Sequence, residues 1–193
     1  MEHENYVRLN CLLQYARDLL EKHLAQRWKT VFGEEMTSEA IKCFLSDTGS
    51  GKRNFTGKLN SLQQDKVQQP SSSWDISLLA LFLRSDPFRS AADVEPLKDV
   101  TSVRNGLAHG PSFHVNNEDF SAMWQKLETA CYHFNGFRSS DEIATIKTAP
   151  VDDLTGRFGD EEDLANSLKD QGNRLYAQGK YEEAAMVYTD AMK

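Results

Sequence analysis

The sequence predicts an all-α protein in which a bundle of helices precedes a short helix-turn-helix. Over most of residues 5–138, apolar side chains recur at steps of three and four, the period of an amphipathic helix. No segment keeps the period-2 alternation of a half-buried strand for more than a few residues. Clusters of Gly, Pro and Ser interrupt the helical pattern at intervals, as connections between helices do.

The first predicted helix is long and runs from Asn5 to Phe32, with Gly33 placed to end it. A shorter helix is expected after Thr37 or Ser38, and another over residues 58–67. The apolar positions of the long helix are Leu9, Leu12, Leu13, Ala16, Leu19, Leu20, Leu24, Trp28 and Val31.

The loop over residues 47–53 superficially resembles a phosphate-binding loop. The pattern G-x-x-x-x-G-K-[ST] fails at Ser46, where the first Gly should stand, and at Arg53, where Ser or Thr should stand. No strand precedes the loop either, so we predict no nucleotide cofactor.

Residues 74–84 are apolar on nearly every side and predict a central, buried helix, with the serines at 71–73 available to cap it. After a break at residues 87–92, a further helix is expected to end at His109, because Gly110 and Pro111 cannot continue it. Its apolar stripe is Val94, Leu97, Val100, Val103 and Leu107.

The last bundle helix is expected to start at Asn117, a good N-cap residue that Glu118 and Asp119 follow in the first turn. Its apolar residues are Phe120, Met123, Trp124, Leu127, Cys131 and Phe134. The tryptophans and Phe134 follow helix periodicity, so we expect them in the core and not stacked on bases.

The chain is divided unevenly by charge. Residues 1–140 hold 16 Lys and Arg against 17 Asp and Glu, whereas residues 141–193 hold 6 against 12, and the total is −7. We therefore predict a bundle over 1–138, a flexible acidic linker over 139–163 and a separate unit over 164–193. Any nucleic-acid contact must come from a local patch on the bundle, because the chain has no global basic field.

No signal peptide or membrane-spanning run is visible in the sequence, so we expect a cytoplasmic protein without a membrane partner. The three cysteines, Cys11, Cys43 and Cys131, are far apart and form no C-x-x-C pair. We expect free thiols that act as small hydrophobic residues, and no metal site or other cofactor.

The segment 103–109 contains Arg104, Asn105 and His109 in the pattern Arg-Asn-x-x-x-His. Together with residues 74–84 and 119–124, it resembles a HEPN domain, of the branch found in a RING-type ubiquitin ligase and in animal proteins of innate-immune architecture. The resemblance covers residues 5–138. It implies a HEPN-type helical bundle that forms a homodimer, in which two copies of the motif meet at the interface.

The resemblance also implies an RNA-directed activity. Histidine can act as a general base on a ribose 2′-hydroxyl, and arginine can stabilise the phosphorane. We therefore expect a metal-independent endoribonuclease that acts on single-stranded RNA and leaves 2′,3′-cyclic phosphate ends, with Arg104, Asn105 and His109 as its catalytic residues. On a regular helix the directions of the Arg104 and His109 side chains differ by about 140° about the helix axis. Both can therefore reach one phosphate only at an interface between packed helices, or where the end of the helix becomes irregular at Gly106 and Gly110.

Residues 164–193 resemble the start of a tetratricopeptide repeat that stops near the end of its first unit. The resemblance implies a protein partner, and Lys169 and Asn173 match the first residues of a carboxylate clamp for chaperone C-termini. Gly179 is expected in the turn. The residues that carry the resemblance are Leu168, Gly172, Tyr176, Gly179, Tyr181, Ala184, Ala185, Tyr188 and Ala191.

An alternative stays open for each motif. Lys-x-x-x-Asn is also common in ordinary repeats, and the other clamp residues would come from later repeats, so Lys169 and Asn173 can be structural residues without a clamp role. Arg104 and His109 can simply satisfy carbonyls and acids such as Asp99 at a helix end, which would make the chain a non-catalytic adaptor for protein partners that is linked to chaperones or ubiquitin. His23 and His133 lie beside apolar stripes, so we expect packing or surface roles for them.

Overall fold

The structure, a computed structural model, describes residues 2–46, 59, 61–109, 115–136 and 140–158, together with four later residues. These four are Tyr176, Gly179, Tyr181 and Ala185. Within these ranges the chain forms helices and no β-strand, which confirms the all-α prediction. None of the described helices combines the length and the apolar character needed to cross a membrane.

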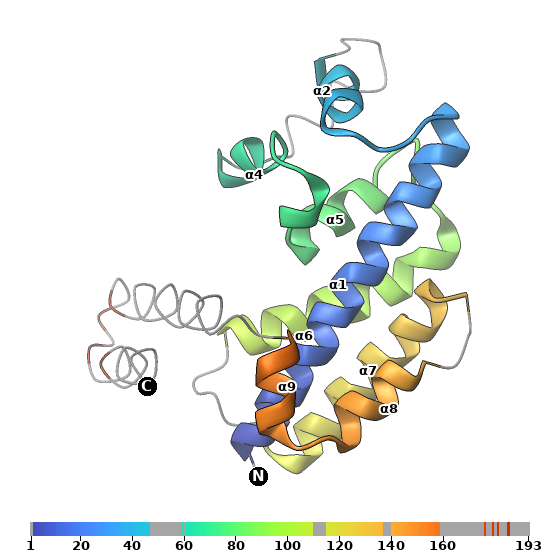
Figure 1. The fold of residues 1–193 in the computed structure, drawn as a ribbon. Helices are drawn as coiled ribbons and strands as arrows, with labels where there is room; N and C mark the ends of the chain where they lie inside the picture. The colour runs from blue at the N-terminus through green and yellow to red at the C-terminus, as the bar shows by residue number, and fades with distance from the viewer. Residues whose placement is uncertain are drawn as a thin grey trace. The chain divides into compact units, whose positions relative to one another are not determined.

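The helices follow the predicted order along the chain (Figure 1). The long first helix and the two long later ones are confirmed. Their bounds, with those of the shorter elements, are α1 Glu2–Phe32, α2 Ser38–Ser46, α4 Ser61–Lys66, η1 Ser71–Ser73, α5 Ile76–Leu83, η2 Ala91–Asp93, α6 Val94–His109, α7 Asn117–Phe134, α8 Asp141–Thr148 and α9 Val151–Phe158. The elements η1 and η2 are single 3-10 turns. The loop at 47–53 lies outside the described residues.

Two compact units share these helices. One unit combines Met1–Gln14, Ser102–Glu128 and Ser139–Lys193, and the other combines Tyr15–Thr101 and Thr129–Arg138. The helices α1, α6 and α7 contribute residues to both.

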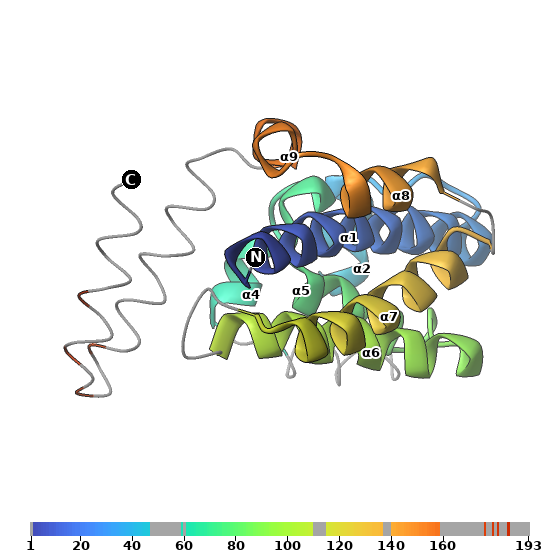
Figure 2. The ribbon, with the colours of Figure 1, turned by 90° about the horizontal axis from the view of Figure 1, so that it is seen from below.

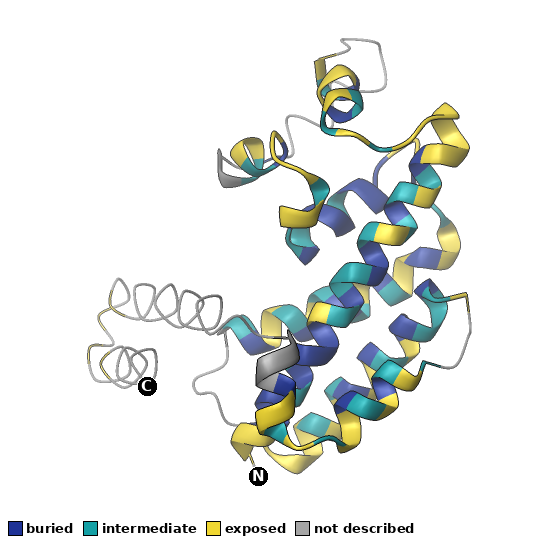
Figure 3. Cartoon of the chain, in the orientation of Figure 1, coloured by how far each residue is buried: buried dark blue, intermediate teal, exposed yellow. Residues whose placement is uncertain are grey.

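The core of the second unit is aromatic. Trp28 stacks on Phe88 with ring centroids 5.5 Å apart, and Phe44 contacts both rings from α2. The ring centroids of Trp74 and of Phe82 in α5 are 4.7 Å apart. Helix α5 is buried on almost every side, as predicted (Figure 3). Such pairs add stability beyond the area that they bury.

The first unit is built around α1, α7 and α8, and Figure 2 shows α8 beside α1. The guanidinium of Arg8 donates a hydrogen bond of 2.7 Å to the carbonyl oxygen of Ile146, near the C-terminal end of α8. Helix ends leave such carbonyls without partners in the helix, so this bond stabilises the end of α8. Ile143, Ile146 and Leu154 are buried. Residues 141–158 of the predicted flexible linker therefore form two helices that bury apolar side chains.

Two predicted helix caps are wrong by one or more positions. Asp75, and none of the serines before it, caps α5, since its Oδ1 accepts a hydrogen bond of 2.8 Å from the Leu78 amide. Asn116 caps α7 through the amide of Asp119, also at 2.8 Å. Asn117 instead accepts a hydrogen bond from the side chain of buried Asn5.

The end of α1 is as predicted: Gly33 has a φ of +75°, and its amide donates to the Lys29 carbonyl.

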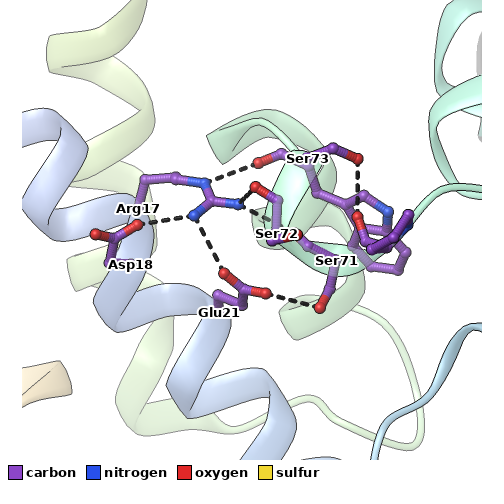
Figure 4. Close-up of polar contacts among 8 residues, drawn as sticks. Arg17, Asp18, Glu21, Ser71, Ser72 and Ser73 are labelled. Atoms are coloured by element: carbon purple, nitrogen blue, oxygen red, sulfur yellow. Dashed lines mark hydrogen bonds and ion pairs between the residues drawn. The ribbon is translucent and has the colours of Figure 1, made fainter. Parts of the chain in front are cut away.

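Arg17 joins α1 to the turn that precedes α5 (Figure 4). Its guanidinium donates to the carbonyl oxygens of Ser71, Ser72 and Trp74 and forms an ion pair of 3.1 Å with Glu21. Glu21 in turn accepts a hydrogen bond of 2.7 Å from the Ser71 hydroxyl. It also pairs with the carboxylate of Asp18 at 2.7 Å. The planar guanidinium thus serves three carbonyls and two carboxylates at the same time, which an ammonium group cannot do.

We expect Arg17→Lys to lower the free energy of unfolding by about 2 kcal/mol, because one ammonium cannot replace these donors. Urea denaturation would measure the loss, with Lys22→Ala, an exposed position on the same helix, as the control. Equal stability of Arg17→Lys and the wild-type protein would contradict this role.

Candidate functional site

The Arg-Asn-x-x-x-His motif occupies the last turns of α6. Val103 and Leu107 are buried there, which turns the residues between them outward. Arg104 is half-buried and Asn105 is exposed. The amphipathic pattern of α6 therefore presents two of the three predicted catalytic residues at the surface.

The Arg104 guanidinium donates a hydrogen bond of 3.1 Å from Nη1 to Oδ1 of Asn105. Within the ranges that the structure describes, Arg104 forms no ion pair with a carboxylate. An arginine whose partner is a neutral amide keeps its charge and several donors for an anionic ligand, and phosphate is a good match for its planar fork.

His109 is the last residue of α6, and its side chain lies outside the described part of the structure. The helix stays regular through Gly106, so it does not loosen there to turn Arg104 toward His109. A Cβ at Gly106 would lie 3.3 Å from Cε of Met123, so the glycine allows α7 to lie close to α6. Within one copy, Asn105 and His109 share a helix face, whereas Arg104 points about 140° away from His109.

The predicted partner-binding residues Lys169 and Asn173 lie outside the described residues. Four residues of the predicted repeat are described, and Gly179 is in a turn, as expected, with a φ of +77° and an amide that donates to the Tyr176 carbonyl. The rings of Tyr176 and Tyr181 are 5.1 Å apart, and both residues are exposed, at 60% and 62%.

A second polar cluster, which the sequence analysis did not predict, is centred on Asp93. This carboxylate is buried in the second unit, yet three groups contact it. His133 Nε2 lies 2.8 Å from Oδ1, and His23 Nε2 and Arg27 Nη2 each lie 3.1 Å from Oδ2. The expected packing role of His23 and His133 is confirmed, since both rings contact Phe134 edge-on. The contacts of both rings with Asp93 were not predicted.

The surroundings of Asp93 hold its pKa below the ordinary value of 3.8. Burial by itself would raise the pKa, because it disfavours the charged form. The hydrogen bonds from His133 and His23, with the positive charges of His23 and Arg27, outweigh this effect. The carboxylate therefore stays ionised and acts as a fixed negative centre that joins η2 to α1 and to the end of α7.

The cluster is an anchor and not a metal site. In the described ranges, no group of three or more His, Cys, Asp and Glu side chains is arranged to hold a metal ion. Both carboxylate oxygens of Asp93 already accept hydrogen bonds from protein groups. No single feature of the sequence could have revealed this, because the three partners come from positions 40 to 70 residues away.

The cysteines differ from one another. All three are free thiols. Cys11 and Cys131 are buried, as expected of small hydrophobic residues, whereas Cys43 is exposed. Burial raises the pKa of the Cys11 thiol to about 11, and Arg8 only partly offsets that effect.

Replacing Asp93 should destabilise the folded protein. We expect Asp93→Asn to lower the free energy of unfolding by about 2 to 3 kcal/mol. The amide has no negative charge, and its NH2 group would face the N–H donors of the surrounding side chains. Chemical denaturation of this variant, beside the exposed control Asp86→Asn, would measure the loss.

The contribution of Asp93 should also depend on pH. Because its folded-state pKa is lowered, the stabilisation is present above the ordinary value of 3.8 and is lost as the pH falls through the lower folded value. The stability difference between the wild type and Asp93→Asn should persist to about pH 4 and shrink below it. A difference that had already vanished at about pH 5 would contradict this.

Thiol chemistry should separate the cysteines. In the native protein, a chromogenic disulfide reagent should modify Cys43 quickly, and Cys11 and Cys131 only after unfolding, because access and thiolate character govern the rate. Cys43→Ser should remove the fast phase, and retention of that phase would contradict the assignment.

Comparison with known proteins assigns this chain to no family. No family model matches it, and no curated protein or solved structure matches it either. The resemblances to a HEPN domain and to a tetratricopeptide repeat therefore stay predictions.

Proposed function

We propose that this chain is an RNA-directed, HEPN-type module that acts as a metal-independent endoribonuclease. The observation that carries the proposal is the Arg104–Asn105 pair. It is presented at the surface by the last turns of α6, and its guanidinium is not neutralised by a carboxylate in the described ranges. Asn105 shares a helix face with His109, so an amide and an imidazole would approach the same substrate phosphate.

The proposed chemistry needs no cofactor. His109 takes the proton from a ribose 2′-hydroxyl, and the 2′-oxygen attacks the adjacent phosphorus. The bond from phosphorus to the 5′-oxygen breaks, and this oxygen leaves as a hydroxyl after it takes a proton from the histidine of the second copy in the proposed homodimer. The guanidinium of Arg104 stabilises the charge that develops on the phosphorane oxygens, through bidentate hydrogen bonds. The products are a 2′,3′-cyclic phosphate and a 5′-hydroxyl.

The proposed working state is a homodimer. On one regular helix Arg104 and His109 diverge by about 140°, so a single α6 does not direct both at one phosphate. If a two-fold axis passes near the end of α6, the histidine of one copy and the arginine of the other can contact the same phosphate. In a symmetric dimer each copy presents the same patch, which makes the composite site contain two arginines and two histidines.

The proposed setting is the cytoplasm, with protein partners recruited through residues 164–193, including Lys169 and Asn173. A second candidate function, a non-catalytic adaptor linked to chaperones or ubiquitin, is favoured by the exposed rings of Tyr176 and Tyr181. Exposed, contacting aromatic side chains are typical of surfaces that bind proteins. The nearly balanced charge of residues 1–140 also favours it, since long single strands are usually bound in basic grooves.

RNA cleavage separates the two candidates. We expect the purified protein to cleave labelled single-stranded RNA in excess EDTA, and His109→Ala and Arg104→Ala each to reduce the rate at least about 100-fold, as the loss of a catalytic acid, base or anion donor does. His3→Ala and Lys126→Ala, at exposed positions, are the matched controls and should cleave like the wild type.

The RNA products and the molecular mass of the protein in solution complete this test. Chromatography of the RNA products should show a 2′,3′-cyclic phosphate end, and light scattering of the protein should give twice the mass of one chain. Equal cleavage by the wild type and His109→Ala, or no cleavage by either, would refute the nuclease and leave the adaptor. An active monomer would refute the composite site.

A further inference from the structure

A small surface pocket lies between the end of α5 and the start of α6, within the second unit. Its volume is about 220 Å³. The residues that line it are Leu83, Arg84, Arg89, Ser90, Val94 and Leu97. None of these belongs to the Arg-Asn-x-x-x-His motif or to the predicted repeat, so the pocket is separate from the proposed nuclease function.

The pocket combines a buried apolar wall with an exposed apolar residue. Leu83 and Leu97 are almost fully buried, at 0% and 1% exposure. Val94, in contrast, is 42% exposed, although the sequence pattern predicts it on the buried stripe of α6. Val94 therefore leaves apolar surface in water beside the two leucines, and an aliphatic group in the pocket would cover that surface.

The charged residues of the pocket are both arginines. Arg84 donates a hydrogen bond of 3.0 Å to the Thr101 hydroxyl, and neither Arg84 nor Arg89 forms an ion pair in the described ranges. Arginines without carboxylate partners are notable in a chain with a net charge of −7. The rim of the pocket is therefore positive and suits an anionic ligand.

The acids near the pocket cancel only part of this charge. Asp93 is buried and held by His23, His133 and Arg27. Glu95 lies 3.4 Å from Lys98 on the same helix. Of the acidic side chains in the segment 83–98, this leaves Asp86 to oppose the two arginines.

The volume decides the size of the ligand. Sites for cofactors and drug-sized molecules usually measure about 300–1,000 Å³, which exceeds this pocket. One aliphatic side chain can enter, while carboxylates on neighbouring residues stay outside against the guanidinium groups. We propose that the pocket binds an acidic peptide segment of a partner protein, with a leucine-like side chain against Leu83, Val94 and Leu97, and with carboxylates on Arg84 and Arg89.

Fluorescence anisotropy with the full-length chain tests this proposal. The probe is a fluorescein-labelled peptide with one leucine flanked on each side by two glutamates. We expect saturable binding that weakens as salt is added. Arg89→Gln should weaken binding about tenfold, as the loss of a charged hydrogen bond does. Val94→Glu, which places a carboxylate at the pocket mouth, should weaken it at least as much.

The controls separate the pocket from general charge attraction. Lys22→Gln removes an exposed cation elsewhere in the same unit and should bind like the wild type. A peptide with serine in place of leucine should lose most of its binding. Both positions substituted in the pocket are exposed, so unfolding midpoints close to that of the wild type should confirm that the variants are folded.

Three results would overturn the proposal. The first is no saturable binding by the wild type, and the second is equal binding by the wild type, Arg89→Gln and Val94→Glu. The third is a phosphoserine peptide that binds more tightly whether or not it contains leucine. That result would identify a phosphate site and not a site for an acidic, aliphatic segment.

Discussion

The second unit depends on one buried negative charge. Asp93 is 1% exposed, and a carboxylate without partners in such a place would be strongly destabilising. His23 and Arg27 from α1 and His133 from α7 satisfy it, so three segments that are distant in sequence must meet at one point. Asp93 immediately precedes α6, so these contacts anchor the segment that leads into this helix.

Side chains that bind backbone carbonyls recur in both units. Arg17 holds the turn before α5 through three carbonyl oxygens, and Arg8 holds the end of α8 through the carbonyl of Ile146. Short helices and turns form few internal hydrogen bonds, so they need such outside donors to be stable. The arginines of α1 thus stabilise short segments that apolar contacts alone would secure weakly.

Three other arginines have a different character. Arg84, Arg89 and Arg104 form no ion pair in the described ranges, although acidic residues outnumber basic ones in the sequence by 29 to 22. A cation left without a carboxylate in an acidic chain retains its capacity to bind an external anion. For Arg104 we infer a phosphate of RNA, and for Arg84 and Arg89 the carboxylates of a peptide. The neighbours decide the difference, since Arg104 lies beside an amide and the other two beside an apolar pocket.

The sequence by itself determined the helical class, the extent of α1, α6 and α7, and the burial of Trp28, Trp74 and Trp124, because helix periodicity over many residues is a local signal. It also singled out Arg104 and Asn105, but their exposure and their mutual hydrogen bond came only from the structure. Tertiary structure alone decided that residues 141–158 form helices, since eight-residue helices carry little periodicity and depend on apolar contacts for stability. It also decided the role of Asp93, because a residue before a helix looks alike in sequence whether it faces water or two histidines from distant helices.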